Sequence, residues 1–248
     1  RVSVVSAMAV NNEVGTVNDL PAISAATRRA APGALVHTDA VQAPCWLDLR
    51  DVTPHVDLLA LSGHKFGGPK GVGVLVERGG PQVAPLILGG GQERERRSGT
   101  HNVAGIVAMA TALRLTDEER EHEVVRLAGL RDRLIDGLMT AIDGVHETVP
   151  PAVDDVRRVA GSAHVCVEGV ESEALLFLLD EADVCASAAS ACASGAMEPS
   201  GVLAARGVDV SFATGALRLS LGHASTEGDI DVGVAVIADA VTRLRSRA

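Results

Sequence analysis

The sequence SGHKFGGPKG, residues 62–71, places a histidine and a lysine where an apolar run, residues 56–61, ends. A lysine in a glycine-rich turn is most often a surface residue. A lysine amine that is partly shielded from water loses basicity, however, and a neutral amine can form a Schiff base. Ser62 and His64 could then hold a phosphate, with glycines that let the backbone approach the ligand closely. The Gly-x4-Gly-Lys order of a P-loop is absent from GGPKGVG.

Two more polar clusters follow apolar runs. Residues 11–13 read Asn-Asn-Glu, and Asp39 and Gln42 come after the next run. A carboxylate at the position of Asp39 commonly caps a helix, but it can instead pair with a protonated pyridine nitrogen and make the ring a better electron sink. Gln42, about one helical turn further on, would face the same way. Ligands of open α/β sheets bind at the carboxyl ends of strands, so the three clusters together predict one shared site.

The elements that position these clusters alternate along the first part of the chain. A helix is predicted from Leu20 to Ala31, with Asp19 as its N-cap and Pro21 at its first position. Near-continuous apolar strands separated by helices or long loops indicate a parallel or mixed sheet that is covered on both faces. The strands are expected over residues 2–10, which should be buried, and over residues 34–37, 57–61 and 72–77.

The second part of the chain is expected to form a smaller lobe. An apolar helix over residues 102–115 is followed by Thr116, whose spacing to Glu119 is that of a capping box and predicts a new, charged helix to about Ile142. We therefore expect a large domain over residues 1–120 and a small domain over residues 121–248. The small domain should contain strands over residues 163–168 and 217–221, helices over residues 171–181 and from 227 onward, and a short helix near residue 202.

Composition excludes several classes of protein. The net charge of −10 argues against binding to nucleic acid, because an acidic surface repels phosphate backbones. No apolar run reaches the length of a membrane span. The cysteines have neither metal-ligand spacing nor a dense disulfide pattern, which favours a reducing, cytoplasmic setting and no metal site. We expect small buried side chains at three of them, Cys45, Cys166 and Cys185.

Six motifs together resemble the cysteine desulfurases, pyridoxal-phosphate enzymes of the class V aminotransferase group. They are NNEVGTVNDL, HTDAVQ, LSGHKFGGPKGVGVL, GGGQERERRSGTHN, SACASGAMEPSGVL and LRLSLG, in the family's order. The resemblance implies the α/β architecture of fold type I, with a mostly parallel sheet in the large domain and a smaller α+β C-terminal domain. It also leads us to expect that the family's N-terminal portion, with a phosphate-cradling turn and a ring-stacking histidine, is absent.

The resemblance implies roles for individual residues. Lys65 matches the lysine that forms the Schiff base with pyridoxal 5′-phosphate. The remaining matches are Asp39 to the partner of the pyridine nitrogen, Gln42 to the partner of the ring hydroxyl, Ser62 and His64 to phosphate contacts, Asn12 to an asparagine near substrate and ring, Thr100 to a threonine that reaches the neighbouring subunit's phosphate, and Arg218 to the arginine that binds the substrate carboxylate. A planar guanidinium suits a carboxylate in bidentate fashion.

Cys192, in the small-residue stretch ASAASACASG, matches the catalytic cysteine. A thiolate that must reach the substrate sulfur needs a mobile, exposed segment. The resemblance implies that sulfur from L-cysteine is left on Cys192 as a persulfide while L-alanine is released. The long cysteine loop resembles the group that serves iron–sulfur assembly and tRNA thiolation, so the implied partners are a sulfur-acceptor protein and a second subunit in a homodimer.

Two alternatives stay open from the sequence. The same scaffold could serve a selenocysteine lyase or a cysteine sulfinate desulfinase, neither of which requires the thiol of Cys192. The chain could also be a non-catalytic, truncated scaffold subunit, although a scaffold would need neither Lys65 nor Arg218.

Overall fold

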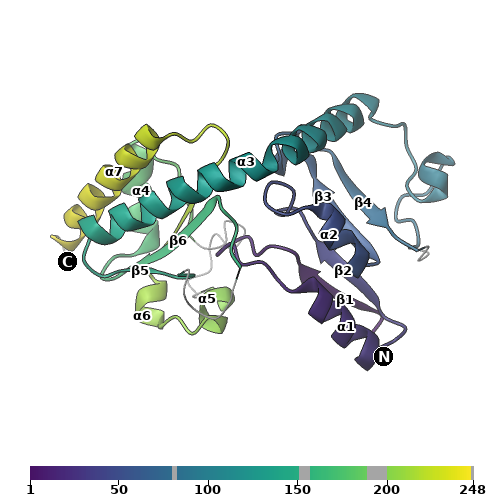
Figure 1. Cartoon of the computed structure of the whole chain (residues 1–248), viewed down its shortest axis with the longest axis horizontal. Helices are drawn as coiled ribbons and strands as arrows, with labels where there is room; N and C mark the ends of the chain where they lie inside the picture. The colour runs from purple at the N-terminus through teal and green to yellow at the C-terminus, as the bar shows by residue number, and fades with distance from the viewer. Residues whose placement is uncertain (80–82, 151–156, 189–199, 247–248) are drawn as a thin grey trace. The chain divides into compact units, whose positions relative to one another are not determined.

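The computed structural model describes residues 1–79, 83–150, 157–188 and 200–246 of the chain (Figure 1). It divides into two compact units. Unit 1 comprises residues 1–10 and 18–120, and unit 2 comprises residues 11–17 and 121–248. The segment Asn11–Val17, which carries one of the three polar clusters, therefore belongs with the second half of the chain.

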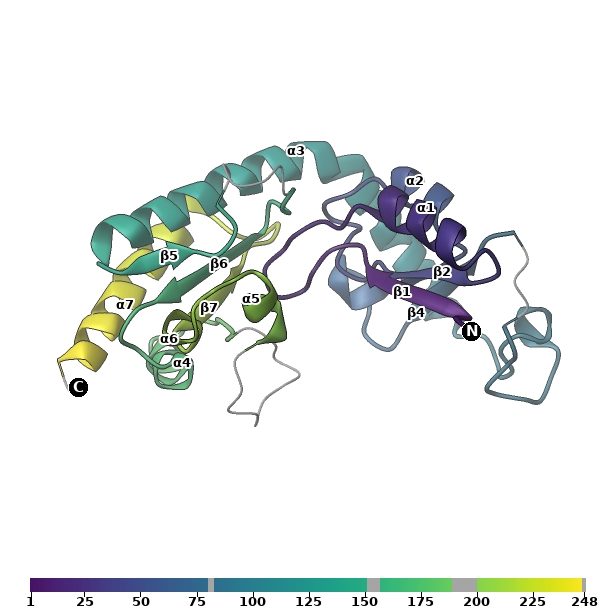
Figure 2. The ribbon, with the colours of Figure 1, turned by 90° about the horizontal axis from the view of Figure 1, so that it is seen from below.

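Unit 1 contains a four-stranded sheet in the order β1-β2-β3-β4, with bounds Val4–Met8, Leu35–Asp39, Leu58–Ser62 and Gly73–Glu77. The first three strands are parallel, and β4 is antiparallel to β3. Helices α1 (Leu20–Ala30) and α2 (Leu49–Val52) lie over one face of this sheet (Figures 1 and 2). Asp19 caps α1 as predicted, with Oδ1 accepting the N–H of Ala22 at 2.9 Å.

Unit 2 contains a three-stranded antiparallel sheet in the order β5-β6-β7, with bounds Val145–Glu147, Ser162–Val167 and Ala216–Ser220. Figure 2 shows the part of α3 (Val103–Ala141) that belongs to unit 2 on one side of this sheet, and α5 (Gly201–Ala205) and α6 (Val210–Ala213) on the other. Helix α4 (Ser172–Glu181) packs against α7 (Glu227–Arg245). Helix α3 turns Leu127, Leu134 and Leu138 into the core at helical spacing.

The predicted helix boundary at Thr116 is wrong, because α3 runs through it without a break. The Thr116 hydroxyl does not cap the helix and instead donates to the carbonyl of Phe66 at 3.2 Å. Two ion pairs on the helix surface support the continuous form: Arg114 with Glu118, and Arg120 with Asp117. The capping box in the structure is at Thr226 and Asp229, at the start of α7.

The expectation that both faces of the first sheet are covered fails at the two edge strands of the described sheet, although Leu58 and Leu59, successive residues of β3, are both buried. Strand β1 lies at the edge of the sheet, and Val2 and Val4 are 53% and 49% exposed. At the other edge, β4 exposes a run of three apolar residues, Val74, Leu75 and Val76. Three short elements, β5, α2 and α6, are not predicted from the sequence; each is only three or four residues long.

Candidate active site

The turn that carries Lys65 is closed by hydrogen bonds of its own backbone. Strand β3 leads into a single 3₁₀ turn, Gly63–Lys65, and the loop is closed where the Gly63 N–H donates to the carbonyl of Val72 at 2.9 Å. Gly67 has a φ of 81°, in the left-handed region that favours glycine. At Gly68 a Cβ would lie 2.9 Å from the Gly63 carbonyl oxygen. The glycines of SGHKFGGPKG therefore serve the closure of this loop.

Polar side chains of unit 1 gather at one edge of the sheet. Strands β2 and β3 are parallel neighbours, so Asp39, the last residue of β2, and Ser62, the last residue of β3, lie at the same carboxyl edge. Asp39 is half-buried, and its Oδ1 accepts the N–H of Val41 at 2.9 Å. Ser62 Oγ and His64 Nδ1 are hydrogen-bonded at 2.9 Å. Gln42 follows Asp39 and is half-buried.

Lys65 itself is exposed, so the described residues do not provide the shielding from water that we expected for its amine. Thr100 is exposed as well and follows Gly99, which has a φ of 117°. Just before it, the Ser98 hydroxyl donates to the carbonyl of Gly90 at 2.7 Å. The loop that presents Thr100 is thus tied back on itself.

In unit 2, the cluster at residues 11–13 forms a tight turn. Asn11 Oδ1 accepts the N–H groups of Glu13 at 2.9 Å and Val14 at 3.0 Å. Gly15 has a φ of 75°, and a Cβ there would lie 2.8 Å from Cβ of Ser162 on β6. Val14 packs into the core cluster of unit 2. The turn is therefore docked closely on the β5-β6-β7 sheet.

The same turn brings Asn12 to Arg218, the arginine predicted to bind the substrate. Arg218 lies on β7, and its Nη1 donates to the carbonyl oxygen of Asn12 at 2.8 Å. Its backbone exchanges two hydrogen bonds with Ser187, at 2.7 and 3.1 Å. The two predicted substrate-binding residues are thus in direct contact.

Cys192 lies outside the described residues, but the structure describes the residues on either side of its segment. Ser187, before the segment, pairs with the backbone of Arg218. Ser200, after it, donates its hydroxyl to the carboxylate of Glu13, which is buried. The residue before the segment therefore contacts Arg218, and the residue after it contacts Glu13, which is next to Asn12. The sequence alone predicts no role for Glu13 or Ser200, although Glu13 lies in the motif NNEVG and Ser200 in MEPSGVL.

One buried titratable residue stands beside this pair. His164 on β6 is directly opposite Arg218 on β7 and is 3% exposed. Burial, followed by the nearby positive charge of Arg218, lowers the pKa of His164 to about 4. The imidazole is therefore neutral at physiological pH. Among the other cysteines, Cys166 is buried as expected, whereas Cys185 is exposed, so our expectation for Cys185 was wrong.

The sequence pattern of the aminotransferase class-V family matches residues 1–232. The chain belongs to this family. Over 247 residues it is 44% identical to an IscS-like cysteine desulfurase of Mycobacterium tuberculosis, a match that covers 100% of this chain and 62% of the relative. The class-V chain thus spans about 62% of the length of that relative.

Solved structures agree with this assignment. A NifS-like protein matches with a TM-score of 0.85 and 34% identity over 98% of this chain and 62% of that one. A structure of SspA in complex with cysteine matches with a TM-score of 0.66 and 28% identity, over 88% of this chain and 58% of that one. The predicted family and its fold-type I architecture are confirmed. No helix in the described ranges is long and apolar enough to cross a membrane.

Proposed function

We propose that this class-V chain carries the site of a cysteine desulfurase, which removes sulfur from L-cysteine and depends on pyridoxal phosphate. The observation that carries the proposal is the Lys65 turn, which follows β3 at the sheet edge that also bears Asp39. Family membership supports it, since relatives across the chain are named cysteine desulfurases. These relatives are named for the reaction on cysteine, so the sulfur reaction is the one to test.

The donor set of unit 1 fits pyridoxal phosphate group by group. Lys65 offers an exposed primary amine for the aldehyde, Asp39 a carboxylate for the pyridine nitrogen, and Gln42 an amide for the ring hydroxyl. The hydrogen-bonded pair of Ser62 and His64 offers polar groups for the phosphate. When bound, this cofactor supplies an electron sink for a carbanion at the substrate Cα. The amine of Lys65 would accept the Cα proton.

Unit 2 offers groups for the amino acid. Arg218 presents a guanidinium to the substrate carboxylate, and its bond to the carbonyl of Asn12 fixes the direction of the side chain. In the reaction, the C–S bond of L-cysteine breaks and an S–S bond to Cys192 forms. The products are alanine and a Cys192 persulfide, so sulfur is transferred without an added oxidant.

Partners follow from the same proposal. We propose a homodimer in which Thr100 reaches the phosphate in the neighbouring subunit, and an acceptor protein, an iron–sulfur scaffold or a tRNA-thiolation protein, that takes the persulfide sulfur. A cytoplasmic setting is part of this proposal.

Covalent capture of the cofactor tests the proposal, because the chain contains only two lysines, Lys65 and Lys70. The chain is incubated with pyridoxal phosphate, reduced with borohydride and mapped by peptide mass spectrometry. We expect the adduct on Lys65 to exceed that on Lys70 by at least about tenfold, because only Lys65 stands among the groups that hold the cofactor. Equal labelling of the two lysines, or labelling of neither, would overturn the proposal.

Sulfur transfer is tested on the same chain. We expect L-cysteine to yield alanine and a persulfide on the wild-type chain, and Cys192→Ser to abolish the persulfide. Cys185→Ser is the matched control, because Cys185 is exposed and belongs to the same region of the sequence. Persulfide that persists in Cys192→Ser would refute the role of Cys192.

A further inference from the structure

The Lys65 turn has backbone groups that need partners from outside it. A single helical turn leaves its last carbonyls without partners inside the helix. Gly63 is the exception, since its carbonyl accepts the N–H groups of Phe66 at 3.2 Å and Gly68 at 2.9 Å. The carbonyls of Lys65 and Phe66 point instead toward side chains of two other segments of unit 1.

Thr116, on α3, holds the carbonyl of Phe66. Its hydroxyl donates to that oxygen at 3.2 Å, across 50 residues of sequence. A threonine inside a helix usually bonds the carbonyl four residues earlier in its own helix. Thr111 on the same helix does so, donating to Val107 at 2.9 Å. The different partner of Thr116 ties the lysine turn to the helix.

Cys45 holds the neighbouring carbonyl. Its Sγ lies 3.6 Å from the carbonyl oxygen of Lys65 itself. Only a protonated thiol can donate there, and burial raises the pKa of the Cys45 thiol, whereas the charge of Arg120 acts in the opposite direction. Burial is the larger effect, so Cys45 stays protonated at neutral pH and keeps its hydrogen.

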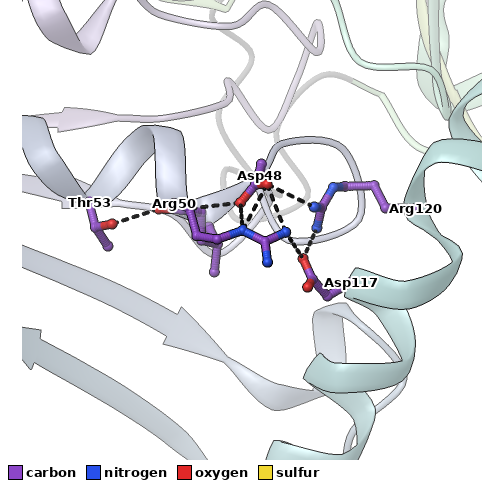
Figure 3. Close-up of polar contacts among 6 residues, drawn as sticks. Asp48, Arg50, Thr53, Asp117 and Arg120 are labelled. Atoms are coloured by element: carbon purple, nitrogen blue, oxygen red, sulfur yellow. Dashed lines mark hydrogen bonds and ion pairs between the residues drawn. The ribbon is translucent and has the colours of Figure 1, made fainter.

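Arg120 pairs with two carboxylates in a network of ion pairs (Figure 3). The Arg120 side chain is 10% exposed and contacts Asp117 at 2.8 Å and Asp48 at 3.5 Å. Asp48 also caps α2 and accepts Arg50 Nε at 2.8 Å, and Arg50 reaches Asp117 at 3.1 Å. The network joins the segment that follows Cys45 to the same part of α3 that carries Thr116.

We infer that Thr116 and Cys45 are positioning residues that hold the Lys65 turn through the carbonyls of Phe66 and Lys65. Neither side chain is inferred to touch the cofactor or the substrate. They fix the backbone from which the Lys65 amine extends, so their loss changes how well that amine meets an aldehyde. The inference rests on the proposed function only for the role of Lys65.

Hydrogen exchange on the cofactor-free chain tests the anchoring by itself. We expect the amides of Phe66 and Gly68 to exchange about tenfold faster in Thr116→Val, the effect of losing one partly buried hydrogen bond. Thr116→Ser keeps the hydroxyl and should exchange as the wild type does. Thr111→Val is the matched control on the same helix. Cys45→Ala, which removes the donor, and Cys45→Ser, which keeps one, form the second pair of variants. Unchanged exchange in both Thr116→Val and Cys45→Ala would overturn the inference.

Covalent capture then tests the consequence for Lys65. The ratio of reduced pyridoxal-phosphate adduct on Lys65 to that on Lys70 should fall several-fold in Thr116→Val and recover in Thr116→Ser. Lys70 is the internal standard, since it lies in the same loop. Unfolding would also bring the ratio toward one, so the ratio is compared only among variants whose thermal unfolding shows that they are folded at the labelling temperature. If the wild-type chain labels Lys65 preferentially and the variants keep the wild-type ratio, the anchoring inference fails while the proposed function stands. If the wild-type chain does not prefer Lys65, the proposed function fails. The hydrogen-exchange data then still decide whether the two side chains anchor the turn.

Discussion

His164 shows what one buried side chain contributes to this molecule. Its Nδ1 is hydrogen-bonded to Oγ1 of Thr148 at 2.7 Å. Arg218 exchanges its backbone hydrogen bonds with Ser187, on the side away from β6. His164 and Arg218 therefore face each other as a non-hydrogen-bonded pair, the kind in which cross-strand side chains lie closest. A protonated His164 would be a buried charge next to the positive charge of Arg218, and both effects disfavour it.

The pH dependence of stability follows from this environment. The pKa of His164 is about 4 in the folded chain, against 6.5 for a free histidine, so between these values the unfolded chain binds the extra proton. The contribution of neutral His164 is fully present above pH 6.5 and is lost as the pH falls toward 4. The loss is about 3 kcal/mol of the unfolding free energy. Denaturant unfolding at a series of pH values measures it.

The matched pair for this prediction is His164→Gln and His223→Gln. His223 is also in unit 2, but it is exposed. Removing His164 should flatten the slope of the unfolding free energy between pH 6.5 and 4, whatever the variant's stability at pH 7. A slope that survives in His164→Gln would assign the effect to other groups.

At the scale of the element, α3 offers two glycines in opposite surroundings. A Cβ at Gly129 would meet no atom within 4 Å, whereas a Cβ at Gly137 would lie 2.8 Å from Cγ2 of Val234 on α7. Valine is stiff at χ1, so Val234 cannot turn away cheaply. Gly137 is thus a point of close approach between two helices, and Gly129 is an open position.

Alanine at these two positions should therefore change stability in opposite directions. Gly129→Ala is expected to raise the unfolding free energy by about 0.5–1 kcal/mol, because alanine loses less backbone entropy in a helix. Gly137→Ala gains the same propensity but should lower stability by about 1–3 kcal/mol through overpacking. Thermal unfolding of the two variants in parallel checks the sign of each. Stabilisation by both would mean that α3 and α7 are not packed this closely.

At the scale of the whole molecule, the sequence predicted most of the long elements but not every contact between them. Local signals placed α1, since Asp19 and Pro21 mark its start, and the three parallel strands, whose apolar runs are continuous. The same kind of signal failed at Thr116, because its hydroxyl bonds a carbonyl 50 residues away. A capping pattern carries no information about so distant a partner. Tertiary contact decided between two helices and one.

The candidate site divides in the same way. Residue types and strand ends predicted that Asp39, Ser62 and His64 would gather at one sheet edge, and resemblance supplied the roles of Asn12 and Arg218. Nothing in the sequence marked Cys45 as a partner of the Lys65 carbonyl, or His164 as the neighbour of Arg218. Both relations depend on the register and packing of segments that are far apart along the chain.

The exposed edge strand β4 predicts that copies of the chain associate. In the described part of the chain, β4 ends the first sheet, and its Val74, Leu75 and Val76 are 38%, 48% and 37% exposed. An apolar edge strand is a template for pairing with another chain. We expect the wild-type sedimentation coefficient to rise with concentration, and Leu75→Lys to weaken that rise. Because Leu75 is only half-buried, its replacement should cost little stability, about 1 kcal/mol or less.

Charge makes this test specific. The chain carries a net charge of −10, so an added lysine reduces the overall repulsion between copies and would by itself favour association. Weaker association of Leu75→Lys would then have to come from the local change on β4 and not from the overall charge. Val125→Lys makes the same change of charge at a residue of α3 that is 75% exposed and belongs to neither sheet. Equal sedimentation of the two variants at every concentration would show that β4 does not drive association.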